Sequence, residues 1–207
     1  MIALIDYGAG NLTSVRKALS ALDARYDTPA SPSQLDGASG IIVPGVGHYG
    51  ATQALDDGWR EAILAGVRGD VPLLGICLGM QWLFEGSDEA SGAPGLALLA
   101  GRCTRLAGRA EAGLKVPHVG WNSLEPSRPS RLLAGVGPGA YVYFTHSYAA
   151  PVTPASVAVT THGDRFAAAV EHGLVFGVQF HPEKSADAGL RILRNFLDVV
   201  EAHHRVP

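Results

Sequence analysis

The chain has 207 residues, of which 47% are hydrophobic and 17% are charged, with a formal net charge of −3. No basic block marks a nucleic-acid-binding protein, and no apolar stretch approaches the roughly 20 residues of a membrane span. The amino terminus lacks the basic region of a signal peptide, so Cys77 and Cys103 are expected to be reduced thiols of a cytoplasmic protein.

The first half of the chain alternates short apolar runs with segments of helical spacing. Buried strands are predicted over 2–6, 40–45 and 71–77, and helices from Thr13, over 59–67 and over 78–84. Strands that are apolar on both faces and alternate with helices indicate a parallel sheet covered on both sides.

The second half is punctuated by glycine and proline between Gly92 and Ala150. Segments 140–150 and 155–161 predict antiparallel strands, and 173–180 predicts a last strand. A terminal amphipathic helix presents Leu190, Leu193, Leu197 and Val200 on one face. We therefore expect an α/β fold with an open, mostly parallel sheet, helices on both faces and an antiparallel extension. With no repeat or linker, residues 1–207 are expected to form a single domain.

Cys77 stands between two glycines, in Gly75-Ile76-Cys77-Leu78-Gly79, where a predicted strand meets a predicted helix. Taken alone, it fits a small buried thiol packed at a strand end. It also fits a nucleophile on a sharp strand-to-helix turn, which needs small neighbours so that the backbone can pass. A helix start there would favour the thiolate and offer free N–H groups to an oxyanion. A nearby base decides between the two.

His181 and Glu183 stand two apart in "QFHPEKS", at the end of the last predicted strand. In extended chain such residues project to the same face, and Pro182 keeps His181 out of the helical region. A carboxylate beside an imidazole fixes its tautomer and stabilises the imidazolium. The alternative is a surface histidine next to a solvated glutamate. Because the carboxyl ends of parallel strands line the functional crevice, Cys77 and this pair at two strand ends favour a nucleophile, base and orienting acid.

The segment "PGVGHYG" (44–50) follows another predicted strand. Its glycines let backbone N–H groups point into a crevice, as an oxyanion site requires. An ordinary glycine turn fits the segment equally well.

Other candidate residues lack the required spacing. The remaining histidines do not have metal-ligand spacing, and neither CxxC nor HExxH occurs, so no metal is expected. "GAGN" at 8–11 is not G-x-G-x-x-G and does not support dinucleotide binding. Cys103 has no glycine neighbours or nearby base and is expected to be structural.

Two of these motifs, G-x-C-x-G-x-Q after a strand and a late F-H-P-E, resemble the class I (triad) glutamine amidotransferases. More narrowly, "IDYGAGNLTSV", "PGVGHYG", "GICLGMQ", "PHVGWN" (117–122) and "QFHPEKS" are similar to the glutaminase subunits of imidazole glycerol phosphate synthase. These segments span nearly the whole chain in the family's order, with no departure at the triad positions. The anthranilate synthase glutaminase typically has "PGPG" where this chain has "PGVG". The resemblance implies a flavodoxin-like three-layer fold.

The resemblance also implies hydrolysis of glutamine to glutamate and ammonia, with no cofactor. Cys77 attacks the side-chain amide, His181 shuttles the proton and Glu183 orients His181. The backbone N–H of Leu78 is the expected fixed oxyanion donor. A second donor is expected near Val46 and Gly47, in a loop whose peptide must turn to complete the site. The residues expected to hold glutamine are Gly47, Gln81, Thr145, His146 and Ser147.

The family docks on a (β/α)8-barrel cyclase subunit that receives the ammonia through its core. That partner makes imidazole glycerol phosphate and an aminoimidazole carboxamide ribotide, a step of histidine biosynthesis. The resemblance therefore implies a heterodimer, without nucleic acid or membrane partners. The residues that match the interface around the ammonia entrance are Asn11, Trp121, Tyr143 and Lys184, for which ordinary surface packing is the alternative.

Three other functions stay open at this point. Another triad amidotransferase could serve a different acceptor, although the narrower motifs count against it. A non-catalytic module on this fold requires a broken triad. A stand-alone cysteine hydrolase should lack "HPE" and should act without a partner.

Overall fold

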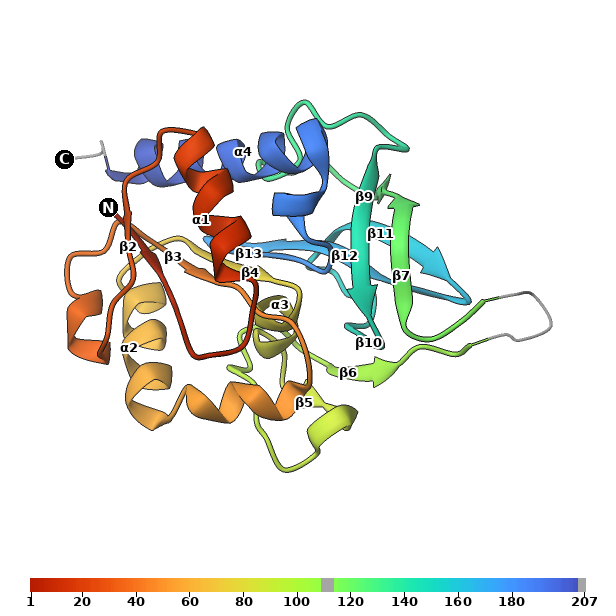
Figure 1. The fold of residues 1–207 in the computed structure, drawn as a ribbon, viewed down its shortest axis with the longest axis horizontal. Coiled ribbons are helices and arrows are strands. Elements are labelled where there is room, and N and C mark those ends of the chain that lie inside the picture. The colour runs from red at the N-terminus through yellow and green to blue at the C-terminus, as the bar shows by residue number, and fades with distance from the viewer. Residues whose placement is uncertain (109–113, 205–207) are drawn as a thin grey trace.

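The computed structural model describes residues 1–108 and 114–204, and its centre is one large twisted sheet (Figure 1). In this part of the chain the sheet has eight strands, in the order β2-β1-β3-β4-β13-β12-β11-β8. The strands are β1 (Ile2–Leu4), β2 (Tyr26–Asp27), β3 (Gly40–Val43), β4 (Leu73–Ile76), β8 (Glu125–Pro126), β11 (Ser156–His162), β12 (Asp164–His172) and β13 (Val175–Val178).

The sheet changes direction at β13. The neighbouring pairs from β2 to β13 are parallel, and those from β13 to β8 are antiparallel. All residues of β1, β3, β4 and β13 are buried, as expected for parallel strands covered on both faces. The prediction of an open, mostly parallel sheet with an antiparallel extension is confirmed.

Helices cover both faces of this sheet (Figure 1). On one face lie α1 (Leu12–Ala21) and α4 (Ala186–His204), and on the other lie α2 (Asp57–Arg68) and α3 (Leu78–Trp82). α1 begins at the cap residue Asn11, whose side chain accepts a hydrogen bond from the Ser14 N–H. None of the described helices is long and apolar enough to cross a membrane.

Successive strand residues belong to two separate cores, because side chains alternate across a strand. Leu4, Ile42 and Leu74 pack in the core that contains the buried side chains of α1 and α4. Their neighbours Ala3, Ile41 and Leu73 pack in the core that contains those of α2 and α3. Because both faces of the sheet are packed, the sheet holds the loops that follow its strands in fixed relative positions.

Two smaller sheets lie beside the antiparallel end. β7 (His118–Ser123) and β9 (Tyr141–His146) form an antiparallel ribbon (Figure 1). The second small sheet consists of β5 (Gly86–Ser87), β6 (Arg102–Arg105) and β10 (Tyr148–Ala149). Short 3-10 helices occur at η1 (Pro32–Leu35), η2 (Tyr49–Ala54), η3 (Asp88–Ala90) and η5 (Pro182–Lys184).

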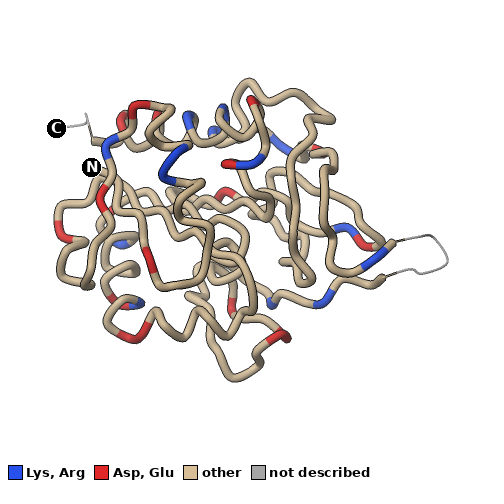
Figure 2. Tube along the Cα trace, viewed as in Figure 1, with Lys and Arg blue, Asp and Glu red and all other residues tan. Residues whose placement is uncertain are grey.

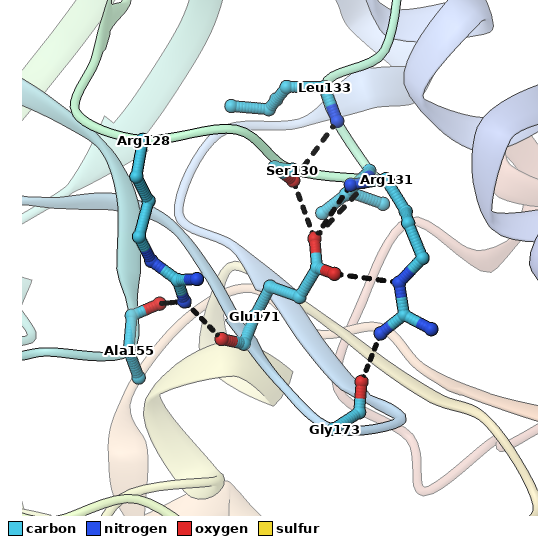
Figure 3. A network of polar contacts seen from close by, with 8 residues as sticks. Arg128, Ser130, Arg131, Leu133, Ala155, Glu171 and Gly173 are labelled. Atoms are coloured by element: carbon cyan, nitrogen blue, oxygen red, sulfur yellow. Dashed lines mark hydrogen bonds and ion pairs between the residues drawn. The ribbon is translucent and has the colours of Figure 1, made fainter.

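Glu171, near the end of β12, holds the loop that follows β8 (Figure 3). Its carboxylate accepts hydrogen bonds from the Ser130 hydroxyl (2.6 Å) and from the Arg131 guanidinium (2.8 Å). Arg128 donates to the Glu171 carbonyl oxygen (2.6 Å). Burial would raise the pKa of Glu171, but the hydrogen bonds from Ser130 and Arg131 outweigh it and lower that pKa. The ionised carboxylate thus ties the loop to the sheet.

One local prediction differs from the structure, and one long strand was missed. α3 ends at Trp82 instead of reaching residue 84, because the N–H groups of Leu83 and Phe84 bond three residues back and tighten the last turn. The nine-residue strand β12 was not predicted. Its centre is an alanine run, and alanine has little intrinsic preference for strands.

Candidate active site

Cys77 occupies the sharp turn between β4 and α3. Its backbone has φ 53° and ψ −104°, a left-handed conformation that is uncommon for any residue except glycine. The Cys77 N–H donates to the Val178 carbonyl at 2.7 Å, which fixes the turn against β13. The flanking glycines are sterically required. A Cβ at Gly75 would lie 2.6 Å from the Gly79 carbonyl oxygen, and a Cβ at Gly79 would overlap the Val43 carbonyl oxygen.

His181 follows β13, the strand paired with β4, so the two strand ends bring it next to Cys77. Its Nδ1 atom lies 2.9 Å from Oε1 of Glu183, and both side chains are almost completely buried. A carboxylate only accepts, so Nδ1 carries the proton and Nε2 is the free end of the ring. The His181 N–H donates to the Tyr143 carbonyl at 2.9 Å, which holds the backbone in place.

The charges around His181 favour its protonated form. Burial alone would lower its pKa, but attraction to the Cys77 thiolate and to the Glu183 carboxylate outweighs burial and raises the pKa of His181 to about 10. His181 Nε2 and Glu183 Oε2 are buried and have no hydrogen-bond partner among the described residues. Since His181 Nε2 makes no hydrogen bond among these residues, Cys77 raises the pKa of His181 by electrostatic attraction through space. The arrangement suits a thiolate–imidazolium pair with an orienting acid.

A cavity of about 230 Å³ opens beside the Cys77 thiol. It is lined by Val46, Gly47, Cys77, Leu78, Gln81, Glu89, Pro117, Thr145, His146, Ser147 and Tyr148. Cys77 thus shares one cavity with every residue predicted to supply oxyanion donors or to hold glutamine. A larger hollow of about 470 Å³ lies along α4, and its described lining includes Asp198 and His203 but no cysteine.

The fixed candidate oxyanion donor is not free in this conformation. The Leu78 N–H donates to the Gly45 carbonyl oxygen at 3.3 Å, within the "PGVG" loop. Gly47 has φ +108°, a conformation that side chains rarely adopt. In this conformation the loop itself therefore occupies the Leu78 N–H, one of the predicted oxyanion donors.

The structure adds two polar residues that we did not predict. Gln179 donates from Nε2 to the Cys77 Sγ at 3.6 Å, and its Oε1 accepts from Gln81 Nε2 at 3.1 Å. Gln179 directly follows β13 and stands two residues before His181, which was a usable signal. Glu89 lines the cavity from η3 and accepts the Tyr49 N–H at 2.7 Å. Nothing in its local sequence marks Glu89, because the chain folds back to bring it there.

His146 lines the cavity and belongs to a chain of hydrogen bonds that includes His118 and Asn122. Its Nδ1 lies 2.9 Å from the Tyr148 carbonyl, so Nδ1 donates and Nε2 accepts from His118 Nδ1 at 3.0 Å. His118 Nε2 then accepts from Asn122 Nδ2 at 3.3 Å. Burial lowers the pKa of His118 to about 4 and that of His146 to about 3. Both rings are therefore neutral at pH 7.

These two histidines make the fold sensitive to acid. Their folded pKa values lie below the usual 6.5 of an unfolded chain, so the unfolded state binds more protons as the pH falls below about 6.5. We expect the free energy of unfolding to fall by roughly 1 to 2 kcal/mol per histidine between pH 7 and pH 5. Urea unfolding at both pH values measures this loss. His118→Gln should reduce it, and His172→Gln, at an exposed position, should not. Equal stability at both pH values would contradict the assignment.

Three of the four predicted partner-interface residues lie together. The Trp121 and Tyr143 rings are 6.2 Å apart at their centroids, and Lys184 Nζ lies 5.8 Å from the Tyr143 ring centroid. Asn11 caps α1, which packs against η5, the segment that contains Lys184.

The β7–β9 ribbon that holds Trp121 and Tyr143 is uncharged and partly apolar on its surface. Charged residues of both signs are spread over the chain, but neither β7 nor β9 contains a Lys, Arg, Asp or Glu (Figure 2). Val119, Trp121 and Tyr141 are 57%, 52% and 61% exposed. Exposed apolar side chains gathered on one element are typical of an interaction surface.

Two further expectations concerned Cys103 and metal binding. Cys103 is buried with a free thiol, and its Sγ lies 3.8 Å from the Gln81 carbonyl oxygen. Burial raises the pKa of the Cys103 thiol, which makes it a poor nucleophile. Within residues 1–108 and 114–204, no three His, Cys, Asp or Glu side chains are grouped to hold a metal ion.

Comparison with solved structures shows the same fold. A crystal structure of a glutamine amidotransferase superposes with a TM-score of 0.74 at 19% identity, covering 97% of this chain and 98% of that one. The structure of PurLQS from Thermotoga maritima gives a TM-score of 0.72 at 18% identity, covering 96% and 98%.

Comparison of sequences is more specific. The family model described as glutamine amidotransferase class-I matches residues 3–200. Imidazole glycerol phosphate synthase subunit HisH of Xylella fastidiosa (strain 9a5c) is 50% identical over 200 residues, which cover 96% of this chain and 97% of the relative. HisH of Methanothermobacter thermautotrophicus is 43% identical over 203 residues, covering 98% and 100%. The chain therefore belongs to the class-I glutamine amidotransferases and, within them, to the family of the imidazole glycerol phosphate synthase subunit HisH.

Proposed function

We propose that this protein hydrolyses glutamine with a Cys77–His181–Glu183 triad and passes the ammonia to the cyclase subunit of imidazole glycerol phosphate synthase. The observation that supports this most is the arrangement at the ends of β4 and β13. These paired strands place a strained, cavity-lining cysteine next to a buried histidine–carboxylate pair. The similarity to HisH subunits of imidazole glycerol phosphate synthase supports a role in histidine biosynthesis.

The proposed reaction proceeds through a thioester. The Cys77 thiolate forms a C–S bond with the side-chain carbonyl carbon of glutamine, and the carbonyl electron pair moves to oxygen. His181 Nε2 gives its proton to the amide nitrogen, and the C–N bond breaks to release ammonia. Water then attacks the thioester while His181 takes a proton from it. The C–S bond breaks, sulfur leaves as the thiolate, and the product is released as glutamate. The proton taken from water stays on His181, which restores the starting thiolate–imidazolium pair. Proton transfer by His181 contributes about 10²- to 10⁴-fold to such steps.

Oxyanion stabilisation requires the "PGVG" loop to change. The Gly45 carbonyl occupies the Leu78 N–H, and in a trans peptide the C=O and N–H point in opposite directions. A turn of the Gly45–Val46 peptide therefore removes the carbonyl from Leu78 and points the Val46 N–H toward the same place. Each oxyanion donor gained is worth on the order of 3 kcal/mol in the transition state. This supports an enzyme that is weakly active at rest and is activated by its partner.

Glutamine is proposed to lie in the cavity with its amino-acid end toward Glu89. Gly47, Gln81, Thr145, His146 and Ser147 surround the side chain of the substrate. The α-ammonium group needs a negative counter-charge, and Glu89 is the one carboxylate in the described lining of this cavity. A hydrogen bond between charged groups is worth about 1.5 to 3 kcal/mol.

Glu89→Gln is therefore expected to raise the KM for glutamine by about ten- to hundredfold, with kcat nearly unchanged. Steady-state kinetics of the complex with the cyclase subunit measure both constants. Glu85→Gln, at an exposed position four residues earlier, is the matched control and should leave KM as it is. An unchanged KM in the Glu89 variant would remove Glu89 from the binding site.

The partner is proposed to be a (β/α)8-barrel cyclase that docks over the β7–β9 ribbon. The Tyr143 carbonyl accepts the His181 N–H, and the Trp121 ring and the Lys184 ammonium lie next to the Tyr143 ring. Asn11 caps the neighbouring helix. Docking there would shield the released ammonia from bulk water, where it would be protonated. We further propose that residues 1–207 act as one domain in the cytoplasm and that catalysis needs no cofactor.

Glutaminase assays with and without the cyclase subunit test this function. We expect weak hydrolysis by the chain alone and strong stimulation by the cyclase subunit with its nucleotide bound. Trp121→Ala should weaken the stimulation, whereas Val152→Ala, with a similarly exposed side chain (50% against 52%), should not. Full turnover without the partner would refute the coupled model, and no turnover in either case would refute the glutaminase itself.

A further inference from the structure

Tyr7, in the turn after β1, has a buried hydroxyl that the proposed reaction does not use. Its oxygen is shielded from solvent and has no hydrogen-bond partner among the described residues. Leaving a buried donor unpaired is unfavourable, and such groups are rare in folded proteins. The Tyr7 hydroxyl therefore requires an explanation.

The hydroxyl lies directly against the "PGVG" loop. A Cβ built on Gly45 would overlap the Tyr7 hydroxyl oxygen, and it would lie 2.8 Å from the Leu78 Cβ. Gly10, three residues after Tyr7, also lies next to the loop, since a Cβ there would be in van der Waals contact with the Gly45 Cα at 3.4 Å. The turn from 7 to 10 thus supports the same peptide whose carbonyl occupies the Leu78 N–H.

When the Gly45–Val46 peptide turns, two hydrogen-bonding groups change partners. The Leu78 N–H becomes free for the oxyanion, and the Gly45 carbonyl loses its donor. A buried carbonyl needs a new donor. Of the buried side-chain atoms without a partner in the described residues, the Tyr7 hydroxyl is the one that contacts Gly45.

We propose that Tyr7 is a positioning residue that holds the turned, active form of the "PGVG" loop by donating its hydroxyl hydrogen to the released Gly45 carbonyl. This inference rests on the proposed glutaminase function and adds a residue to its regulation. In the resting form the Tyr7 hydroxyl has no partner among the described residues, and the Leu78 N–H is occupied by the Gly45 carbonyl. When the Gly45–Val46 peptide turns, the hydroxyl gains an acceptor and the Leu78 N–H becomes free. The hydroxyl stays a donor at neutral pH, because burial, with smaller effects from Cys77 and Tyr49, raises the pKa of Tyr7.

Tyr7→Phe tests this proposal, because it removes the hydroxyl and keeps the ring. In the complex with the cyclase subunit, kcat for glutamine hydrolysis should fall about tenfold with KM nearly unchanged, since one hydrogen bond no longer favours the turned loop. The inhibition constant of glutamate 5-semialdehyde should rise by a similar factor, because its adduct with Cys77 places an oxygen in the oxyanion site. Alkylation of Cys77 by iodoacetamide forms no oxyanion and should keep its rate.

Tyr26→Phe is the matched control. Tyr26 pairs with Ile2 at the start of β1, at the opposite end of that strand from Tyr7. Tyr26→Phe should therefore leave kcat, the inhibition constant and the alkylation rate at their wild-type values. A wild-type kcat in the Tyr7 variant of an active complex would overturn the role of Tyr7 and leave the proposed function intact. A parallel fall in alkylation and hydrolysis would place Tyr7 in support of the thiol instead. A wild-type complex that hydrolyses no glutamine would overturn both proposals.

Discussion

Cys77→Ala should abolish glutamine-dependent synthesis, with a loss in kcat on the order of 10⁴-fold or more. Alanine cannot form the thioester, and no other thiol reaches the cavity, since the Cys103 thiol is buried behind Gln81 among the described residues. The fold should be retained, because the side chain becomes only slightly smaller at this strained position. The complex should therefore still make its product from added ammonium. Parallel assays with glutamine and with ammonium measure the two activities.

Cys103→Ala is the control for this experiment, because it also removes a buried thiol. Glutamine use should persist in that variant, at a small cost in stability. Retained glutaminase activity in Cys77→Ala would refute the nucleophile. Loss of ammonium-dependent activity as well would mean that the substitution disrupts the complex and not only the chemistry.

Gly79→Ala is expected to destabilise the protein by about 3 kcal/mol or more. The added Cβ would overlap the Val43 carbonyl oxygen, which belongs to the neighbouring buried strand and not to a flexible side chain. Neither α3 nor β3 can move without disturbing the Cys77 turn, so activity should be lost together with stability. Urea unfolding and glutaminase assays measure the two effects.

Gly92→Ala provides the comparison, because nothing lies within 4 Å of a Cβ at that position. Its unfolding free energy should change by about 0.5 kcal/mol or less. If Gly79→Ala were as stable as Gly92→Ala, close packing would not be the reason why residue 79 is a glycine.

The parallel half of the sheet could be predicted because its strands are apolar on both faces, as in "GIIV" and "LLGI". β12 could not, because alanine has little preference for strands and the segment forms a strand through its pairing with β11 and β13. Similarly, the local motifs singled out Cys77 and His181, whereas Glu89 reaches the cavity through contacts that join distant segments.

The sequence by itself determined the alternation of strands and helices and the chemical groups of the candidate site. These properties depend on local patterns, namely hydrophobic spacing, glycines at a sharp turn and a histidine two residues from a glutamate. Only the tertiary structure decided which groups are satisfied and which are free. The Leu78 N–H is occupied by Gly45 and the Tyr7 hydroxyl has no partner among the described residues, because both depend on how the loops after β1, β3 and β4 pack together. Hydrogen-bond partners between distant segments follow from that packing, and no spacing along the chain encodes them.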